Sequence, residues 1–362
     1  MHDGDCSVRV QFVTHSCLVI EAGPVRLLCD PWLTGRAFLD GWELLVPSPE
    51  TIESLNPTHI WISHEHPDHF SPRDLLAVSE GRRRDIIVLY QETTDRKVER
   101  FLSSKGYSVQ VLPPGEPVEL APDINVTCNP IGADSWLLFD GFGRRILNLN
   151  DCITGQDILV TDPDQLPTDV LEAMGDQVLE PDLLLTQFSY SNWVGNPGDH
   201  HLHRLQAETK LNQIRQQARY LRPKAIFPFA SFVWFCHEEN THHNACINTI
   251  DHVLPVIEQE GAQPVILYPG DQWTVGDTLD TTEAEARWRR VYAGLDTRSA
   301  QDAIPVLFEE LTHLFSEYRD RIQAKNDWDR VLDLKNRGWL APAQIYLWDL
   351  NHSVGFDLVD GL

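Results

Sequence analysis

The feature that most constrains this chain is a short loop that carries three histidines and an aspartate. His64 to His69 read His-Glu-His-Pro-Asp-His and follow the apolar run 58–63, which the pattern predicts to be a buried strand. Because side chains alternate along an extended backbone, His64 and His66 point the same way and can bind one metal ion. Asp68 and His69 come next and can bind a second ion. Imidazole and carboxylate donors together suit zinc, iron or manganese. The alternative interpretation is a His-rich surface loop that binds no metal.

A further carboxylate, Asp151, stands just after another apolar run, 146–149, which is also predicted to be a strand. In a two-metal site one carboxylate often bridges the ions, and a residue at the end of a rigid strand suits that task. The alternative is an ordinary turn aspartate. Because the sequence also contains the histidine loop, we favour the interpretation that Asp151 bridges two metal ions.

Composition excludes several classes of function. The 362 residues carry a formal charge of −25, which argues against binding to nucleic acid or to an anionic membrane surface but not against an anionic small substrate. We find no run of about 20 apolar residues and no secretory signal at the start of the sequence. The seven cysteines are scattered, with no C-x-x-C pair and no Rieske-type box, so we expect reduced thiols and a cytoplasmic protein.

The order of the predicted elements indicates an α/β protein. Strands come first and then alternate with helices, which predicts two packed sheets with helices outside, an αββα sandwich. We expect a catalytic domain over 1–280 and a small C-terminal α+β extension over 281–362, with two long helices and a strand pair. Strands are predicted over 8–20, 25–29, 58–63, 86–90, 109–112, 124–129, 135–139, 146–149, 343–350 and 353–359, and helices over 72–78, 94–103, 205–221, 282–295 and 303–325.

The strand, the histidine loop and the strand-end aspartate together resemble the metallo-β-lactamase superfamily, over roughly residues 8–270. Within it, the chain is most similar to the catalytic portion of the CMP-N-acetylneuraminate hydroxylase family. Two departures from that family are the lack of a Rieske module in this sequence and the lack of any sign of nucleotide binding. The residues that carry the closer resemblance are 14–17, 30–38, Gly41 and Trp42, 62–69, 149–152, 227–232 and His237.

The resemblance also exposes a missing ligand. Hydrolases of the superfamily usually place a third site-one histidine before the bridging aspartate, but this chain has no histidine from Phe70 to Asn150. Asp134, at the head of a predicted strand, is the best placed substitute. With His64 and His66 it would form a set of two histidines and one carboxylate with open positions, typical of iron enzymes that bind O₂. The alternative is that Asp134 caps a turn.

Site two needs a final ligand beyond Asp68, His69 and Asp151. We prefer His237, which follows the strand-like segment 225–235 and matches the resemblance. His15, on the first predicted strand, is interpreted as an outer neighbour of the metals or as a core histidine. The rival candidates for the final ligand are His200, His201, His203, His242 and His243.

Two enzyme classes fit these residues. The first, which we favour, is a non-haem di-iron oxygenase or hydroxylase that acts on a small metabolite and takes electrons from a separate reductase or ferredoxin. The second is a zinc hydrolase of an ester, amide or lactone, in which Asp68 orients the nucleophile. The hypothesis of a non-catalytic module stabilised by a metal is weaker, because the number of potential ligands exceeds what one structural site needs. We assign catalytic roles to Asp68 and Asp151, and the binding of two divalent metal ions to His64, His66, Asp68, His69, Asp134, Asp151 and His237.

Overall fold

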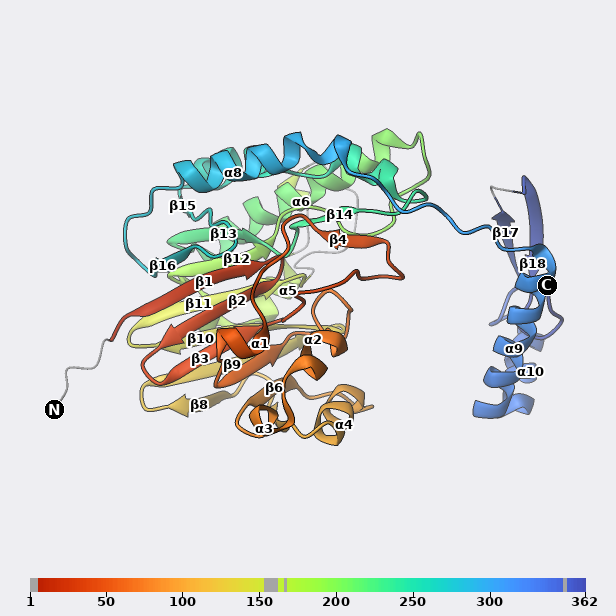
Figure 1. Cartoon of the computed structure of the whole chain (residues 1–362), viewed down its shortest axis with the longest axis horizontal. Helices are drawn as coiled ribbons and strands as arrows, with labels where there is room; N and C mark the ends of the chain where they lie inside the picture. Colours follow the sequence, from red (N-terminus) through yellow and green to blue (C-terminus); the bar gives the residue numbers. More distant parts are fainter. Residues whose placement is uncertain (1–5, 153–161, 166–167, 348–349) are drawn as a thin grey trace. The chain divides into compact units, whose positions relative to one another are not determined.

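The computed structural model describes residues 6–152, 162–165, 168–347 and 350–362, and the chain divides after Gln301 into two compact units. Unit 1 contains two seven-stranded sheets among its described residues (Figure 1). The first sheet has the order β16 (Gln272–Thr274), β1 (Val8–Thr14), β2 (Cys17–Ala22), β3 (Val25–Cys29), β5 (His59–Ile62), β6 (Ile87–Gln91), β7 (Ser108–Leu112). The second has the order β15 (Gln263–Pro264), β13 (Ala225–Phe229), β12 (Leu183–Gln187), β11 (Arg144–Asn150), β10 (Asp134–Gly141), β9 (Ile124–Ile131), β8 (Pro117–Ala121).

Each sheet is antiparallel on one side and parallel on the other. In the first, β1, β2 and β3 are antiparallel, and β3, β5, β6 and β7 are parallel. In the second, β8 to β11 are antiparallel, and β11, β12, β13 and β15 are parallel. Because parallel strands end at the same edge, the residues that follow β3, β5 and β11 meet at one end of the sandwich, where ligands bind in open α/β sheets.

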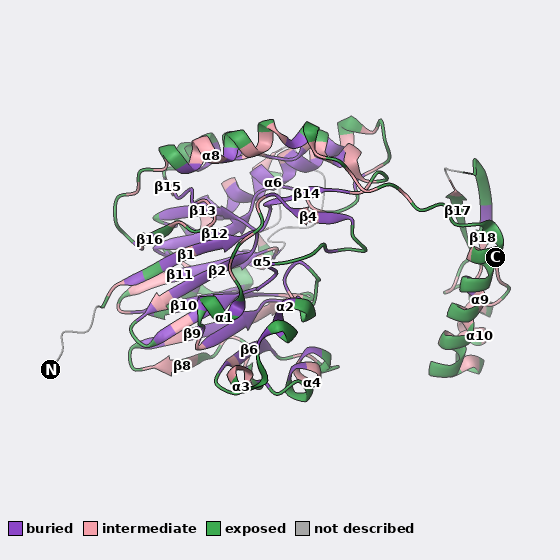
Figure 2. Cartoon of the chain, viewed as in Figure 1, coloured by how far each residue is buried: buried purple, intermediate pink, exposed green. Residues whose placement is uncertain are grey.

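Side chains of the first sheet alternate between two apolar cores. On β2, Leu18 and Ile20 belong to the large core that includes the second sheet, whereas Cys17 and Val19 belong to a smaller core. The smaller core also contains Leu75 and other residues of the helices that follow β5. This period of two is what a sheet covered on both faces requires. The inner strands of both sheets are buried, whereas the edge strands β7 and β8 and the outer faces of the helices are more exposed (Figure 2). The predicted αββα sandwich is confirmed.

The helices of unit 1 connect and cover these sheets. The N-cap side chain of Ser71 accepts a hydrogen bond from the backbone of Asp74, and Pro72 occupies the first helical position, so α2 begins where its sequence predicts. The α-helices are α1 (Ile52–Leu55), α2 (Pro72–Ala77), α3 (Glu80–Arg83), α4 (Lys97–Ser104), α5 (Asp169–Ala173), α6 (His200–Leu221), α7 (Ile250–Gln259) and α8 (Thr282–Ala293). The 3₁₀ segments are η1 (Pro163–Gln165), η2 (Asp176–Val178), η3 (Thr241–Cys246) and η4 (Leu295–Thr297).

Two of the predicted strands were wrong because each one is broken by a turn. The run 8–20 forms β1 and β2, which pair antiparallel around a turn at His15, whose φ is +35°. The run 225–235 breaks at Ala230, whose φ is +47°, and its second half becomes β14 (Val233–Phe235), which pairs with β4 (Trp42–Leu44) outside the main sheets. Both turns lie within mostly apolar sequence without glycine or proline at the turn, so pattern alone did not reveal them.

The boundary between the units also differs from the expected position at residue 280. Helix α8 belongs to unit 1, because Trp288 anchors it to the core. The Trp288 ring is fully buried, stacks on Phe232 with centroids 4.3 Å apart, and donates its indole N–H to the carbonyl of Leu267 at 2.9 Å. The charged residues of α8 therefore form its solvent-exposed face, and its other face packs on the sandwich.

We expect Trp288→Ala to lower the free energy of unfolding by about 3–5 kcal/mol, because it leaves a large cavity and an unpaired carbonyl. Urea denaturation followed by circular dichroism measures this. Trp339→Ala is the matched control, since the Trp339 side chain is exposed. Equal losses of stability in both variants would show that α8 does not support the core.

Unit 2, Asp302–Leu362, contains two helices and a hairpin among its described residues: α9 (Phe308–Lys325), α10 (Trp328–Asn336), β17 (Ala343–Leu347) and β18 (His352–Phe356). Phe315 of α9 packs edge-on against Phe356, and Lys335 of α10 bridges Asp357 and Asp360. Of the α+β extension expected over 281–362, this unit contains the helix expected over 303–325 and the strand pair, whereas the helix expected over 282–295 belongs to unit 1 and α10 was not predicted. In the part of the chain that the structure describes, none of the helices has the length and apolar character needed to cross a bilayer.

Candidate metal centre

The ends of three strands and the β1–β2 turn deliver polar side chains to one end of the sandwich. Asp30 follows β3, the histidine loop follows β5, and Asp151 follows β11. His15 reaches the same place from the turn. His15, Asp30, His64, Asp68 and His69 are buried, which costs free energy unless polar partners are present, whereas His66 is exposed and Asp151 is half-buried.

The first group of donors consists of His64, His66 and Asp134, whose ligand atoms lie within 4.8 Å of one another. His64 Nε2 lies 2.8 Å from His66 Nδ1 and 3.5 Å from Asp134 Oδ1. The structure therefore brings Asp134 to the position where the sequence lacked a third histidine. Ser63 Oγ lies 2.9 Å from His64 Nδ1, which leaves His64 Nε2 directed at the group.

The second group is centred on His69. Its Nε2 lies 3.2 Å from Asp68 Oδ2 and 3.2 Å from Asp151 Oδ2. His15 Nε2 lies 3.3 Å from the same Asp68 oxygen, so His15 extends this group. His64 of the first group also lies within reach of His69 and Asp151, so His64 connects the two groups. We had interpreted His15 only as an outer neighbour or a core histidine on a strand, because the turn that aims it at Asp68 was not evident from the sequence.

The buried carboxylates and imidazoles at this end of the sandwich shift one another's pKa values. Burial lowers the pKa of His64 to about 4, which keeps its imidazole neutral. Burial alone would lower the pKa of His69 too, but the charges of Asp68 and Asp151 hold it well above its usual value. Burial and the neighbouring Asp151 carboxylate raise the pKa of Asp134 to about 6. In the metal-free chain a protonated His69 is thus the cation that balances the carboxylates.

The donor set fits two divalent cations. Asp68 Oδ1 and Asp151 Oδ1 are buried without a hydrogen-bond partner, a costly state that a bound cation would relieve. The donors are imidazole and carboxylate, which suit iron, zinc and manganese. A metal would displace the proton of His69, as metal binding to histidine generally does.

A fully buried aspartate, Asp30, holds the histidine loop in place. Its carboxylate accepts hydrogen bonds from the backbone N–H and the hydroxyl of Ser63, both at 2.8 Å, and from the side-chain amide of Asn150. It also lies 3.0 Å from His69 Nδ1, which directs His69 Nε2 at Asp68 and Asp151. This is the outer partner that metal-binding histidines usually have.

We expect Asp30→Asn to weaken metal affinity by roughly 10- to 100-fold, because the amide removes an acceptor that orients His69. Competition with a chromophoric chelator measures the affinity. Asp140→Asn is the control, since Asp140 is exposed on β10. An affinity equal to that of the control would contradict the orienting role.

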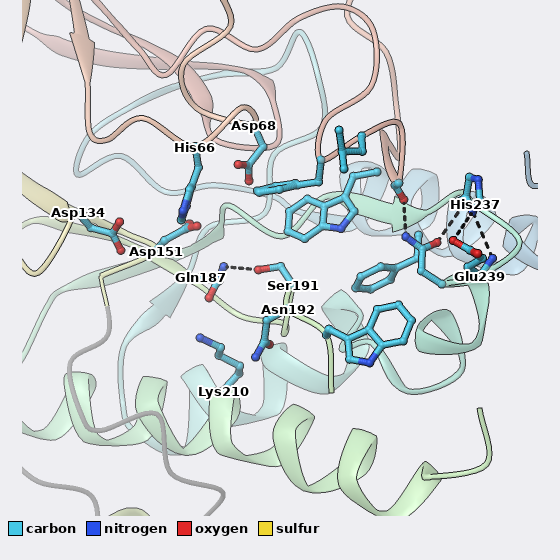
Figure 3. A pocket seen from close by; sticks show the side chains of 17 residues that line it. His66, Asp68, Asp134, Asp151, Gln187, Ser191, Asn192, Lys210, His237 and Glu239 are labelled. Atoms are coloured by element: carbon cyan, nitrogen blue, oxygen red, sulfur yellow. Dashed lines mark hydrogen bonds and ion pairs between the residues drawn. The ribbon is translucent and has the colours of Figure 1, made fainter. Parts of the chain in front are cut away.

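His237, our preferred final ligand, does not join these groups. Because β14 leaves the main sheet to pair with β4, the chain carries His237 to the far end of the pocket (Figure 3). Its Nδ1 there lies 3.7 Å from Glu239 Oε2, and among the described residues it belongs to no cluster of metal-binding donors. The rivals His200, His203, His242 and His243 gather elsewhere, at the start of α6 and in η3, and His201 is exposed.

A cavity of about 570 Å³ opens over the metal-binding groups. His66, Asp68, Asp134 and Asp151 line one end, and His237 and Glu239 line the other (Figure 3). Lys210 reaches it from α6 and, of the described lining residues, is the only lysine or arginine. Gln187 and Ser191, joined by a 3.0 Å hydrogen bond, and the aromatic rings of Phe38, Trp42, Trp193 and Phe235 complete the wall.

Comparisons with known proteins agree with this architecture. Residues 9–140 match the family model of the beta-lactamase superfamily domain. The cytidine monophosphate-N-acetylneuraminic acid hydroxylase of Xenopus laevis is 29% identical over 236 residues, which cover 62% of this chain and 38% of that protein. The hydroxylase of Danio rerio is 27% identical over 277 residues, covering 67% and 44%. The chain thus spans about two fifths of the length of these curated relatives.

Solved structures extend the likeness in fold. A possible metal-dependent hydrolase from Veillonella parvula superimposes with a TM-score of 0.52 at 13% identity, covering 74% of this chain and 99% of that one. At this identity the likeness concerns the fold alone, and it is the fold predicted from the sequence.

Proposed function

We propose that this chain, which contains a β-lactamase superfamily domain and has the metallo-β-lactamase fold, is a two-metal oxygenase that hydroxylates or otherwise oxidises a small anionic metabolite. The observation that carries the proposal is the donor set of His64, His66 and Asp134. Two histidines and one carboxylate leave open positions and are typical of non-haem iron enzymes that bind O₂. The hydroxylase names of the curated relatives support the same chemistry.

The bound metals, iron in this proposal, would supply redox chemistry toward O₂ with electrons from a separate reductase or ferredoxin. The protein's own residues do the rest. Asp30 and Ser63 fix His69 and His64 through the hydrogen bonds described above. The aromatic side of the pocket excludes water from the substrate, and the rigid strand ends keep the reacting groups in register.

Lys210 points to an anionic substrate. Its side chain is buried and lines the cavity, so its ammonium group would attract an anion bound there more strongly than an exposed lysine would. We expect Lys210→Met to raise KM by roughly 10- to 100-fold with kcat changed only slightly, because a hydrogen bond to a charged group is lost. The KM of Lys210→Arg, which keeps the charge, should lie between those of the unaltered chain and Lys210→Met. Steady-state kinetics measure both, and a loss of kcat at unchanged KM would speak against substrate binding by Lys210.

The decisive experiment separates oxidation from hydrolysis. The apoprotein is loaded anaerobically with Fe(II) or with Zn(II), and each form is assayed with a reductant against anionic metabolites, including the cytidine monophosphate-N-acetylneuraminic acid named for the relatives. We expect O₂ uptake and a product with one added oxygen from the iron form only. Hydrolysis by the zinc form without O₂ uptake by the iron form would overturn the proposal.

The second candidate is a zinc hydrolase of an ester, amide or lactone. The same donor set favours it, because two histidines and a carboxylate also form catalytic zinc sites with an open position. In that case Asp68, buried between His15 and His69, would orient the attacking water. We rank it second because the hydroxylase relatives match the chain in sequence, whereas hydrolase neighbours match it in fold only.

A further inference from the structure

Four histidines that play no part in the metal centre form a second cluster. His200 and His203 stand in the first turn of α6, and His242 and His243 lie in η3. The ring centroids of His242 and His243 are 4.1 Å apart, and those of His203 and His243 are 4.9 Å apart. Ligand atoms of His203, His242 and His243 all lie within 4.8 Å of one another, as do those of His200, His203 and Cys246.

The two central rings are buried with few polar partners. His203 and His243 are fully buried; neither ring nitrogen of His243 has a hydrogen-bond partner, and His203 has only the backbone of Val194 beside it. A buried imidazole in that state costs free energy, and such groups call for an explanation. Burial and the neighbouring His242 lower the pKa of His243 to about 4, so its ring is neutral and has a lone pair to donate.

We propose that His203, His242 and His243 form a binding site for a divalent transition metal ion of the zinc class, separate from the metal centre. Three imidazoles, one from the first turn of α6 and two from η3, are a donor set that zinc accepts. The positive end of α6 disfavours a cation, but the Asp199 carboxylate that precedes α6 supplies compensating negative charge.

Such an ion would join two walls of the pocket. The segment before α6 carries Ser191 and Trp193 into the pocket, and the segment before η3 carries His237 and Glu239. Trp193 packs edge-on against His242 and His243, at 5.4 and 5.0 Å between centroids. We infer that the ion is structural and fixes the rim of the pocket, since the cluster itself does not line the cavity among the described residues.

The test uses the full chain with His66→Ala and Asp151→Ala, which removes ligands of the metal centre. We expect the apoprotein of this variant to bind one Co(II) ion, with the intense visible absorption of a four-coordinate site. Adding His243→Gln or His203→Asn should abolish that band and the bound equivalent. Adding His201→Gln should leave both unchanged, because the neighbouring His201 is exposed and belongs to none of the clusters among the described residues.

The otherwise unaltered chain provides a second measurement. Its zinc content at saturation should fall by one equivalent in His243→Gln and stay constant in His201→Gln, with circular dichroism confirming that both are folded. Equal uptake in the two variants, or no Co(II) band in the chain that lacks the metal centre, would overturn the proposal. Metal content is independent of activity, so this result does not depend on whether the chain is an oxygenase.

Discussion

Replacing Asp151 with alanine leaves the metal centre with fewer than about one ion in place of two, and reduces turnover to background. The Asp151 carboxylate lies 3.2 Å from His69 Nε2 and within reach of His64, and we expect it to lie between the two ions. Without it, neither ion has a complete set of ligands and the positive charges of the two ions are no longer separated by an anion. His66→Ala should lose the ion of the first group in the same way.

Elemental analysis measures this effect in chains that also carry His243→Gln, so that the histidine cluster of α6 and η3 contributes no ion, with circular dichroism to confirm folding. Asp140→Ala is the matched control, because it removes an exposed aspartate from the adjacent strand β10. Retention of both ions in His66→Ala and in Asp151→Ala would refute the metal centre itself, whatever the reaction.

Asp134→Ala is expected to release the ion held by His64 and His66, to leave the other ion bound, and to reduce oxidation to background. The reason is that Asp134 supplies the only carboxylate of the first group. Unchanged metal content and activity would instead place Asp134 in a structural turn at the start of β10. The one-ion result would distinguish Asp134 from Asp151, whose loss should affect both ions.

The ionised Asp134 carboxylate should also destabilise the metal-free chain, as expected of a residue retained for its role in metal binding. Burial and Asp151 raise the pKa of Asp134 to about 6, above its unfolded value, so the folded metal-free chain loses stability as pH rises through that range. At pH 7.5 we therefore expect Asp134→Asn to stabilise the metal-free chain by about 1–3 kcal/mol, with little effect at pH 4. Urea denaturation at both pH values tests this, and destabilisation at pH 7.5 would contradict it.

The sequence by itself determined the metal-binding loop and the sandwich. His64, His66 and Asp68 follow a strand whose apolar pattern is local, and Asp151 follows another, so both could be placed from a few neighbouring residues. The absence of histidine between residues 70 and 150 led to Asp134, which the structure brings to 3.5 Å from His64. Such inferences succeed because strand ends and side-chain alternation depend on short-range geometry.

Only the tertiary structure decided which distant residues meet. Left-handed turns at His15 and Ala230 break two continuous apolar runs, and these turns send His15 to Asp68 and send His237 away from the metals. Pairing between α6 and η3 gathers His203 and His243, which are 40 residues apart, into a buried cluster. These outcomes depend on how sheets and helices pack. When one residue adopts a left-handed backbone conformation, the direction of the following chain changes, and a local sequence pattern does not reveal this.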